Sequence, residues 1–171
     1  PMTGSEVEVS GLEVAVEATG ALIVDDVSLR LASGHVMGVV GESGSGKSPL
    51  ALAMLGYAKQ GARISAGHVV VVGVDLLSLS ERELRAVRGR KVAYVPQDPA
   101  TALNPALSIR TQLTEGLGRR REVSLPALRE LLRAVGLPDD DGFLKRRPRE
   151  LSGGQQQRIA IAMAIAADPR L

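Results

Sequence analysis

The first forty residues alternate between apolar and polar side chains over short stretches, a pattern that predicts β-strands. Val-Glu-Val at 7–9, Leu-Glu-Val-Ala-Val-Glu at 12–17 and Val-Ser-Leu-Arg-Leu at 27–31 follow it. The unbroken apolar run at 35–40 is typical of a buried parallel strand, and a further strand is predicted over 67–73. The N-terminal part of the chain is therefore expected to be built around a sheet.

Helices are predicted between and after these strands. An apolar helix is expected over 49–58. A charged helix over 80–89 begins with a capping box, in which Ser80 is the N-cap and Glu83 stands three residues later. Lys-Val-Ala-Tyr-Val-Pro-Gln-Asp-Pro at 91–99 is interpreted as a strand that ends in a proline-bounded loop.

Strand signals stop after residue 100, and residues 101–150 are expected to form a helical insertion in an α/β frame. Amphipathic helices are predicted within 107–117 and 124–137. Arginine-rich runs at 119–121 and 145–149 flank them. These runs are interpreted as exposed faces of the insertion, with contact to a transmembrane partner or lipid headgroups as the sharper alternative.

Composition narrows the class of protein. A chain of 171 residues with 44% hydrophobic side chains can bury a core, and it is most simply one domain. The net charge of +2 gives no reason to expect a nucleic-acid partner. The absence of cysteine excludes disulfides and thiolate metal sites, and it fits a reducing cytosol. The longest apolar run is too short to span a membrane, and the N-terminus does not resemble a signal peptide.

A phosphate-binding loop follows the apolar run at 35–40. Eight residues fit the pattern G-x-x-x-x-G-K-[ST] at every fixed position: Gly41, Glu42, Ser43, Gly44, Ser45, Gly46, Lys47 and Ser48. In such a loop the glycines let backbone N–H groups converge on phosphate oxygens. Lys47 is then expected to reach the β- and γ-phosphates, and Ser48 to offer an oxygen to Mg²⁺. The alternative is a plain Gly/Ser-rich turn.

Pro49 departs from the usual loop. Proline is tolerated in the first turn of a helix, where no intrahelical hydrogen bond is lost. However, the amide after the serine usually also faces phosphate, and proline has no N–H. We therefore expect weaker nucleotide binding than a threonine or valine at this position would give.

A second glycine-led helix start narrows the family. The residues concerned are Leu151, Ser152, Gly153, Gly154 and Gln155. This LSGGQ sequence, after the P-loop and a helical segment, resembles the signature motif of ABC-type ATPases, and Gln97 resembles the Q-loop glutamine of that family. The stretch Val-Pro-Gln-Asp-Pro-Ala-Thr-Ala-Leu-Asn-Pro that contains Gln97 also resembles importers of oligopeptides, dipeptides and nickel. The alternatives are a plain helix start with Ser152 as N-cap and a polar loop residue at Gln97.

The resemblance implies a fold and an assembly. It implies a P-loop NTPase (RecA-like) parallel sheet with an N-terminal antiparallel β part and an α-helical subdomain, incomplete at the C-terminus. The expected divisions are the β part and P-loop core at 1–97, the helical subdomain at 98–150, and the signature motif with its helix at 151–171. Two such domains pair head to tail, so Ser152 and the amides after it would hold the γ-phosphate of ATP bound to a partner.

The resemblance also implies roles and absences. Lys47 and Gln97 would be catalytic, and Ser48 and Gln97 would contact Mg²⁺. The family usually places an aromatic residue near 16–19, where it stacks on adenine, but this chain has none there. The family's Mg²⁺-ordering Asp, water-activating Glu and switch His would follow Leu171. We therefore expect this chain to bind MgATP weakly and to hydrolyse almost none.

Other carboxylates and histidines are interpreted as structural. Asp25 and Asp26 are expected in turns or on the surface, and the Asp run at 139–141 in a solvated loop. Asp168 falls in a turn at a helix end. His35 and His68 are both expected on the surface at strand starts.

The sequence thus predicts an ATP-binding piece of an ABC importer for peptides or a similar small solute or nickel, with ATP and Mg²⁺ as cofactors. Its expected partners are a second nucleotide-binding domain and transmembrane permease subunits. The expected location is the cytoplasmic face of the cell membrane. Two alternatives stay open: a non-transport ABC-type ATPase, and a truncated fragment that binds nucleotide without turnover.

Overall fold

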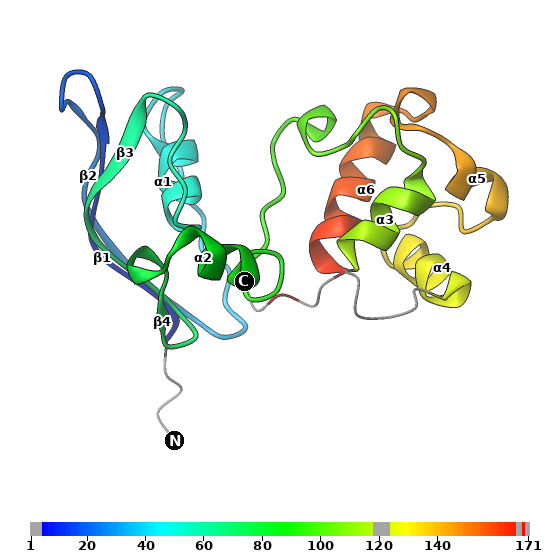
Figure 1. Cartoon of the computed structure of the whole chain (residues 1–171), viewed down its shortest axis with the longest axis horizontal. Helices are drawn as coiled ribbons and strands as arrows, with labels where there is room; N and C mark the ends of the chain where they lie inside the picture. Colours follow the sequence, from blue (N-terminus) through cyan, green and yellow to red (C-terminus); the bar gives the residue numbers. More distant parts are fainter. Residues whose placement is uncertain (1–4, 118–123, 167–168, 170–171) are drawn as a thin grey trace. The chain divides into compact units, whose positions relative to one another are not determined.

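The computed structural model describes residues 5–117, 124–166 and 169 (Figure 1). These residues divide into two compact units, one up to Arg88 and one from Gly89 onward. The domain ranges expected from the sequence, with divisions after residues 97 and 150, stay predictions. Among the described residues, no helix is long and apolar enough to cross a membrane.

The first unit is built on a four-stranded antiparallel sheet with the order β2-β1-β3-β4. The strands are β1 (Ser5–Val16), β2 (Leu22–Ala32), β3 (Ala62–Val71) and β4 (Val74–Asp75). In β1 the buried positions run Val7, Val9 and then Leu12, Val14, so the alternation slips by one residue at Gly11. Gly11 has φ 55, and the pairing of β1 with both neighbours shifts register here, which is the mark of a β-bulge.

Two short α-helices complete this unit, with α1 lying against one face of the sheet (Figure 1). Helix α1 (Lys47–Ala53) buries Leu50 and Leu52, and it is shorter than the predicted helix over 49–58. Helix α2 (Glu81–Val87) follows the 3-10 turn η1 (Leu76–Ser78). The capping box predicted at its start is confirmed, because the Ser80 and Glu83 side chains each accept a hydrogen bond from the other residue's amide.

Two predicted strands are wrong in this structure. Residues 35–40 form no strand, and Val36 and Val40 are 99% and 92% exposed. Within 91–99 only Val92 makes an isolated bridge. A strand forms only where a neighbour supplies hydrogen bonds, and none of the strands in the described ranges pairs with either run. The sheet of these residues is accordingly antiparallel throughout.

The second unit is helical, as predicted for 101–150. Its elements are η2 (Pro99–Thr101), α3 (Ile109–Gly116), α4 (Leu125–Ala134), α5 (Asp141–Lys145), η3 (Pro148–Glu150) and α6 (Gly153–Ile165). One core joins them, around fully buried Ile109, Leu132, Phe143 and Ile159. Helix α6 therefore packs with the helical insertion, and its N-terminus, which carries the LSGGQ sequence, is held by that core. The arginine run at 119–121 lies outside the described residues.

Candidate functional site

The P-loop enters α1 through a glycine that the fold requires. Gly46 is the N-cap of α1 and has φ 87, in the left-handed region that favours glycine. A Cβ on Gly46 would lie 2.6 Å from the carbonyl oxygen of Ile23 in β2. The loop backbone is therefore pressed directly against the sheet, and this contact fixes where the first turn of α1 points.

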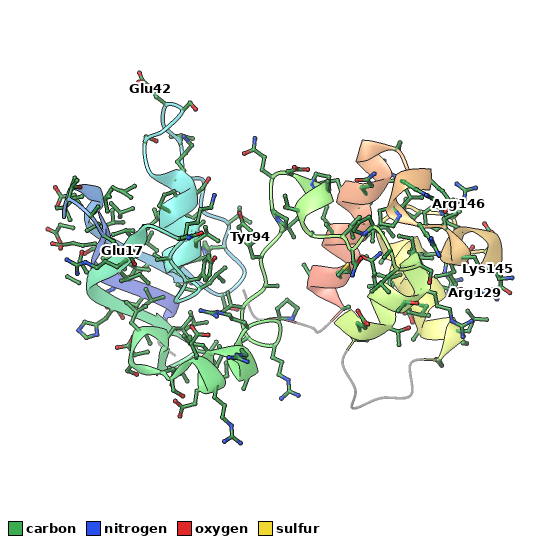
Figure 2. All side chains as sticks on the ribbon, turned by 45° about the horizontal axis from the view of Figure 1, so that its top comes forward. Glu17, Glu42, Tyr94, Arg129, Lys145 and Arg146 are labelled. Atoms are coloured by element: carbon green, nitrogen blue, oxygen red, sulfur yellow. The ribbon has the colours of Figure 1, made fainter. Side chains whose placement is uncertain are left out.

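The Lys47 side chain folds back over the loop that precedes it. Its Nζ donates hydrogen bonds to the carbonyl oxygens of Gly41, at 2.8 Å, and Glu42, and it lies 3.2 Å from the Ser45 hydroxyl oxygen. The ammonium group is thus held at the inner side of the loop, while Glu42 stands at the loop's outer tip (Figure 2). The P-loop thus surrounds the Lys47 ammonium group, which is close enough to interact with an anion bound beside the loop.

The first turn of α1 has no side-chain cap. Its N–H groups at Lys47 and Ser48 point out of the helix end, where the helix dipole adds partial positive charge. A pocket of about 270 Å³ opens at this point, lined by the loop, by Val39 and Val40, and by Asp25 and its neighbours in β2. Amides without a side-chain cap, a lysine and a pocket therefore lie together at this helix start.

Pro49 is the third residue of α1, so its missing N–H removes no intrahelical hydrogen bond. The proline ring lines a separate, mainly apolar pocket of about 210 Å³ together with Val14, Ile23 and Leu52. Proline in place of the usual residue therefore has two structural consequences. The first turn of α1 has one fewer N–H donor, and an apolar side chain lines the pocket beside α1.

The start of α6 differs from that of α1, because its own side chains form hydrogen bonds with the backbone amides of its first turn. The Ser152 hydroxyl accepts a hydrogen bond from the Gln155 amide at 3.3 Å, and the Gln155 side-chain oxygen accepts one from the Ser152 amide at 3.0 Å. This is a complete capping box. Leu151 is buried in the helical core and anchors the motif.

Gly153 and Gly154 are exposed at this helix start, and the fold does not require them. A Cβ on either would meet nothing within 4 Å, and neither has a positive φ. Alanine is the better helix former, so glycine here carries a cost of up to about 1 kcal/mol with no return from internal packing. Internal packing therefore does not explain these glycines, and they leave the backbone open to approach from outside.

Sequence reasoning missed the residue that holds this motif in place. The Gln156 side-chain amide donates to the carbonyl oxygens of Pro148, at 2.9 Å, and Leu151, at 3.3 Å. It therefore fixes the turn that leads into Ser152. The three glutamines after the glycines indicated that a side-chain amide could bond the preceding turn. Which glutamine does so depends on the direction in which each side chain leaves the helix.

Gln97 lies in the second unit, while the P-loop lies in the first. Its side chain is exposed in the turn before η2. The next residue, Asp98, caps η2 by accepting a hydrogen bond from the Ala100 amide at 3.0 Å. Gln97 is therefore presented on an ordered turn, and its predicted contact with Mg²⁺ stays a prediction.

The Asp run at 139–141 is not the solvated loop that the sequence predicted, because Asp140 caps α5 and Asp141 is its first residue. Asp139 and Asp141 pair with Arg133 and Arg129, at 3.7 and 3.0 Å, and Asp140 caps α5. Asp26 has φ 44 within the bulge of β2. Asp168 lies outside the described residues. Within the described ranges, no group of three His, Asp or Glu side chains is placed to hold a metal ion.

Both histidines are exposed, as expected, but neither stands at a strand start, since His35 lies in no strand and His68 lies within β3. His35 Nδ1 lies 3.1 Å from the Ser33 carbonyl oxygen, and His68 Nδ1 lies 2.8 Å from Asp75 Oδ2. Burial raises the pKa of the Asp75 carboxyl, but hydrogen bonds from His68 and from the amides of Leu77 and Val69 lower it more, so the pKa falls below its usual value. Asp75 thus serves the turn around β4.

Comparison with known proteins agrees with the geometry. The family described as ABC transporter matches residues 24–171. The chain is 42% identical over 152 residues to the dipeptide transport ATP-binding protein DppD of Haemophilus influenzae, covering 86% of this chain and 46% of that protein. It is 37% identical over 177 residues to the oligopeptide transport ATP-binding protein OppD of Bacillus subtilis, covering 96% and 48%. The chain therefore spans about half the length of the curated relatives it matches.

Solved structures give the same result for the fold. The dimeric bacterial ABC transporter cassette MJ0796 superposes with a TM-score of 0.78 at 25% identity, covering 95% of this chain and 70% of that one. The same cassette in a post-hydrolysis state, bound to ADP and Pi, also gives 0.78, at 26% identity. These likenesses confirm the α/β fold class of an ABC ATP-binding cassette, although the sheet of the described residues is antiparallel.

Proposed function

The chain belongs to the ABC transporter family, and from this premise we propose that it is the ATP-binding part of an importer for peptides or a similar small solute. The observation that carries the proposal is the uncapped start of α1, where Lys47 and free amides face a pocket. This arrangement fits a nucleotide's phosphates, because a lysine ammonium group and the amides of Lys47 and Ser48 are already in place, although Pro49 supplies no N–H.

Each P-loop residue has a role that follows from its position. On nucleotide binding, Lys47 exchanges its bonds to the Gly41 and Glu42 carbonyls for bonds to phosphate oxygens. The exposed Ser48 hydroxyl fits Mg²⁺, because a hard cation prefers oxygen ligands and keeps most of its waters. Mg²⁺ supplies charge neutralisation between the phosphates when bound. Gln97 would complete this metal site and position the attacking water.

The start of α6 serves a second nucleotide, held by the P-loop of another nucleotide-binding domain. Its capping box keeps the first turn formed, and the open space at Gly153 and Gly154 lets a γ-phosphate come close to the backbone. The proposed head-to-tail pairing follows, because each chain then offers one P-loop and one signature motif. The names of its dimeric cassette neighbours support this assembly.

The transported solute and the membrane partner rest on the relatives. DppD and OppD are named as dipeptide and oligopeptide transport ATP-binding proteins. We propose by analogy that this chain works beside permease subunits on the cytoplasmic face of the cell membrane. Closure of the nucleotide sandwich would then be the step that drives import.

Calorimetric titration of the full chain with MgATP tests the proposal. Lys47→Ala removes the enclosed cation and is expected to weaken binding by about 100-fold. Lys145→Ala is the matched control, since Lys145 is an exposed lysine on α5. Equal MgATP affinity in wild type and Lys47→Ala would show that the P-loop is not the nucleotide site.

A further inference from the structure

Arg88 makes a set of contacts that neither the P-loop nor the signature motif explains. It stands directly after α2, and its guanidinium group reaches the far end of α1. Its Nε donates to the Leu55 carbonyl oxygen at 2.9 Å, and its Nη2 donates to the Gly56 carbonyl oxygen at 2.7 Å. The same group lies 6.0 Å from the Tyr57 ring centroid, and its Nη1 lies 3.5 Å from a Glu81 carboxylate oxygen.

These contacts fix the C-terminal end of the helix whose other end binds phosphate. The two carbonyls follow α1 directly, where a positive charge also interacts favourably with the helix dipole. Gly56, with φ 65, lets the chain pass so close to α2 that a Cβ would lie 3.0 Å from a Leu84 methyl carbon. Since α1 has only seven residues, about 10 Å, a shift at this end reaches Lys47.

Arg88 also occupies a particular place in the chain. It is the last residue of the first unit, and Gly89 begins the second. The Gly89 amide donates to the Val92 carbonyl oxygen at 2.7 Å, which forms the turn where the chain enters the second unit. Five residues beyond Val92 the chain reaches Gln97. The side chain of Arg88 is thus bonded to the backbone just beyond α1, at the point where the chain enters the second unit.

We propose that Arg88 is a positioning residue that couples phosphate binding at the P-loop to the turn at 89–92. The proposal rests on the proposed nucleotide site. Phosphate binding pulls on the first turn of α1, the rigid helix passes the shift to the Leu55 and Gly56 carbonyls, and the guanidinium fork carries it to the backbone of Arg88. By linkage, anything that holds the 89–92 turn also changes nucleotide affinity by the same factor.

The matched test replaces arginine by lysine at two positions of one helical segment. Arg88→Lys keeps the charge but loses the two-pronged geometry. Arg85→Lys is the control, because Arg85 is exposed on α2. Calorimetry on the full chain is expected to show MgATP binding about fivefold weaker in Arg88→Lys and unchanged in Arg85→Lys.

A second readout separates coupling from a merely structural role. In wild type, saturating MgATP is expected to change hydrogen exchange at the amides of 89–92 by about twofold or more, as well as protecting the P-loop. In Arg88→Lys at saturating MgATP, the P-loop stays protected while 89–92 no longer responds. The wild-type arm needs no variant, so unresponsive 89–92 amides would overturn the coupling even if Arg88→Lys folds poorly.

The outcomes are distinguishable. A wild-type chain that does not bind MgATP would overturn the proposed function and this coupling with it. Normal MgATP binding with unresponsive 89–92 amides would overturn the role of Arg88 alone. The same conclusion would follow if Arg88→Lys bound MgATP as tightly as wild type.

Discussion

Helices α1 and α6 both begin at glycines, and they differ in how the first turn is satisfied. In α1 no side chain caps the helix, and Lys47 bonds the loop's own carbonyls. In α6 Ser152 and Gln155 cap each other completely. The first helix start is therefore left open by its own side chains, while the second is closed by a capping box and would meet the proposed ligand as a preformed surface.

The glycines differ in the same way. Gly46 is required by the fold, because its backbone conformation and its approach to Ile23 exclude a side chain. Gly153 and Gly154 are free to change as far as internal packing is concerned. One glycine thus shapes the loop, and the other two leave room for an outside group. Stability measurements without nucleotide can separate these two uses of the same residue.

Gly46→Ala should have the largest effect. The left-handed φ and a Cβ 2.6 Å from the Ile23 oxygen are expected to lower the free energy of unfolding of the first unit by about 3 kcal/mol. Urea unfolding followed by circular dichroism measures it. Gly153→Ala is the control and should leave stability unchanged or slightly raised. Equal losses in both variants would erase the distinction between the two helix starts.

Pro49→Thr is expected to change nucleotide binding at α1 without changing its stability. It restores an N–H at the third position of α1, and a charge-assisted hydrogen bond to phosphate should tighten MgATP binding by about tenfold. The gain should be absent from stability measured without nucleotide. An unchanged dissociation constant for MgATP would show that the missing amide does not matter.

Ser152→Ala tests whether the capping hydrogen bond of α6 stabilises the second unit without a ligand. Losing the cap should cost about 1 kcal/mol of stability in the second unit without any nucleotide present. Ser48→Ala is the matched change at α1, where the serine caps nothing, and it should stay within about 0.5 kcal/mol of wild type. If both serines gave the same loss in urea unfolding, α1 would not be an open site.

Lowering the pH should have the smallest effect on stability. It should affect the capping box of α2, which contains a glutamate, but not the capping box of α6, which contains a glutamine. Hydrogen bonds from the Ser80 hydroxyl and amide hold the pKa of Glu83 below its usual value of 4.5. The stabilisation by Glu83 is therefore full above that value and is lost as pH falls through the lower folded-state pKa. Gln155 does not titrate. Hydrogen exchange between pH 5 and 3, corrected for intrinsic rates, should rise at the start of α2 only, and Glu83→Gln should abolish the difference.

The local features of both helix starts could be predicted from the sequence. Each of these features depends on residues only a few positions apart, so the sequence alone reveals them. They are the P-loop pattern, the Ser152 cap and the Ser80–Glu83 capping box. The predicted strand at 35–40 failed because an apolar run does not specify its hydrogen-bonding neighbour. The role of Arg88 could not be predicted for the same reason, because its hydrogen-bond partners lie 32 and 33 residues away in the sequence.

If α1 starts at an open phosphate site and α6 at a closed cap, the two helix starts respond differently to a nucleotide. Nuclear magnetic resonance of the chain labelled with ¹⁵N-glycine tests it most directly, with MgADP as the ligand because MgADP has no γ-phosphate for α6. The amide signals of Gly44 and Gly46 are expected to shift on titration, while those of Gly153 and Gly154 stay in place. Unmoved Gly44 and Gly46, or shifts confined to Gly153 and Gly154, would contradict it.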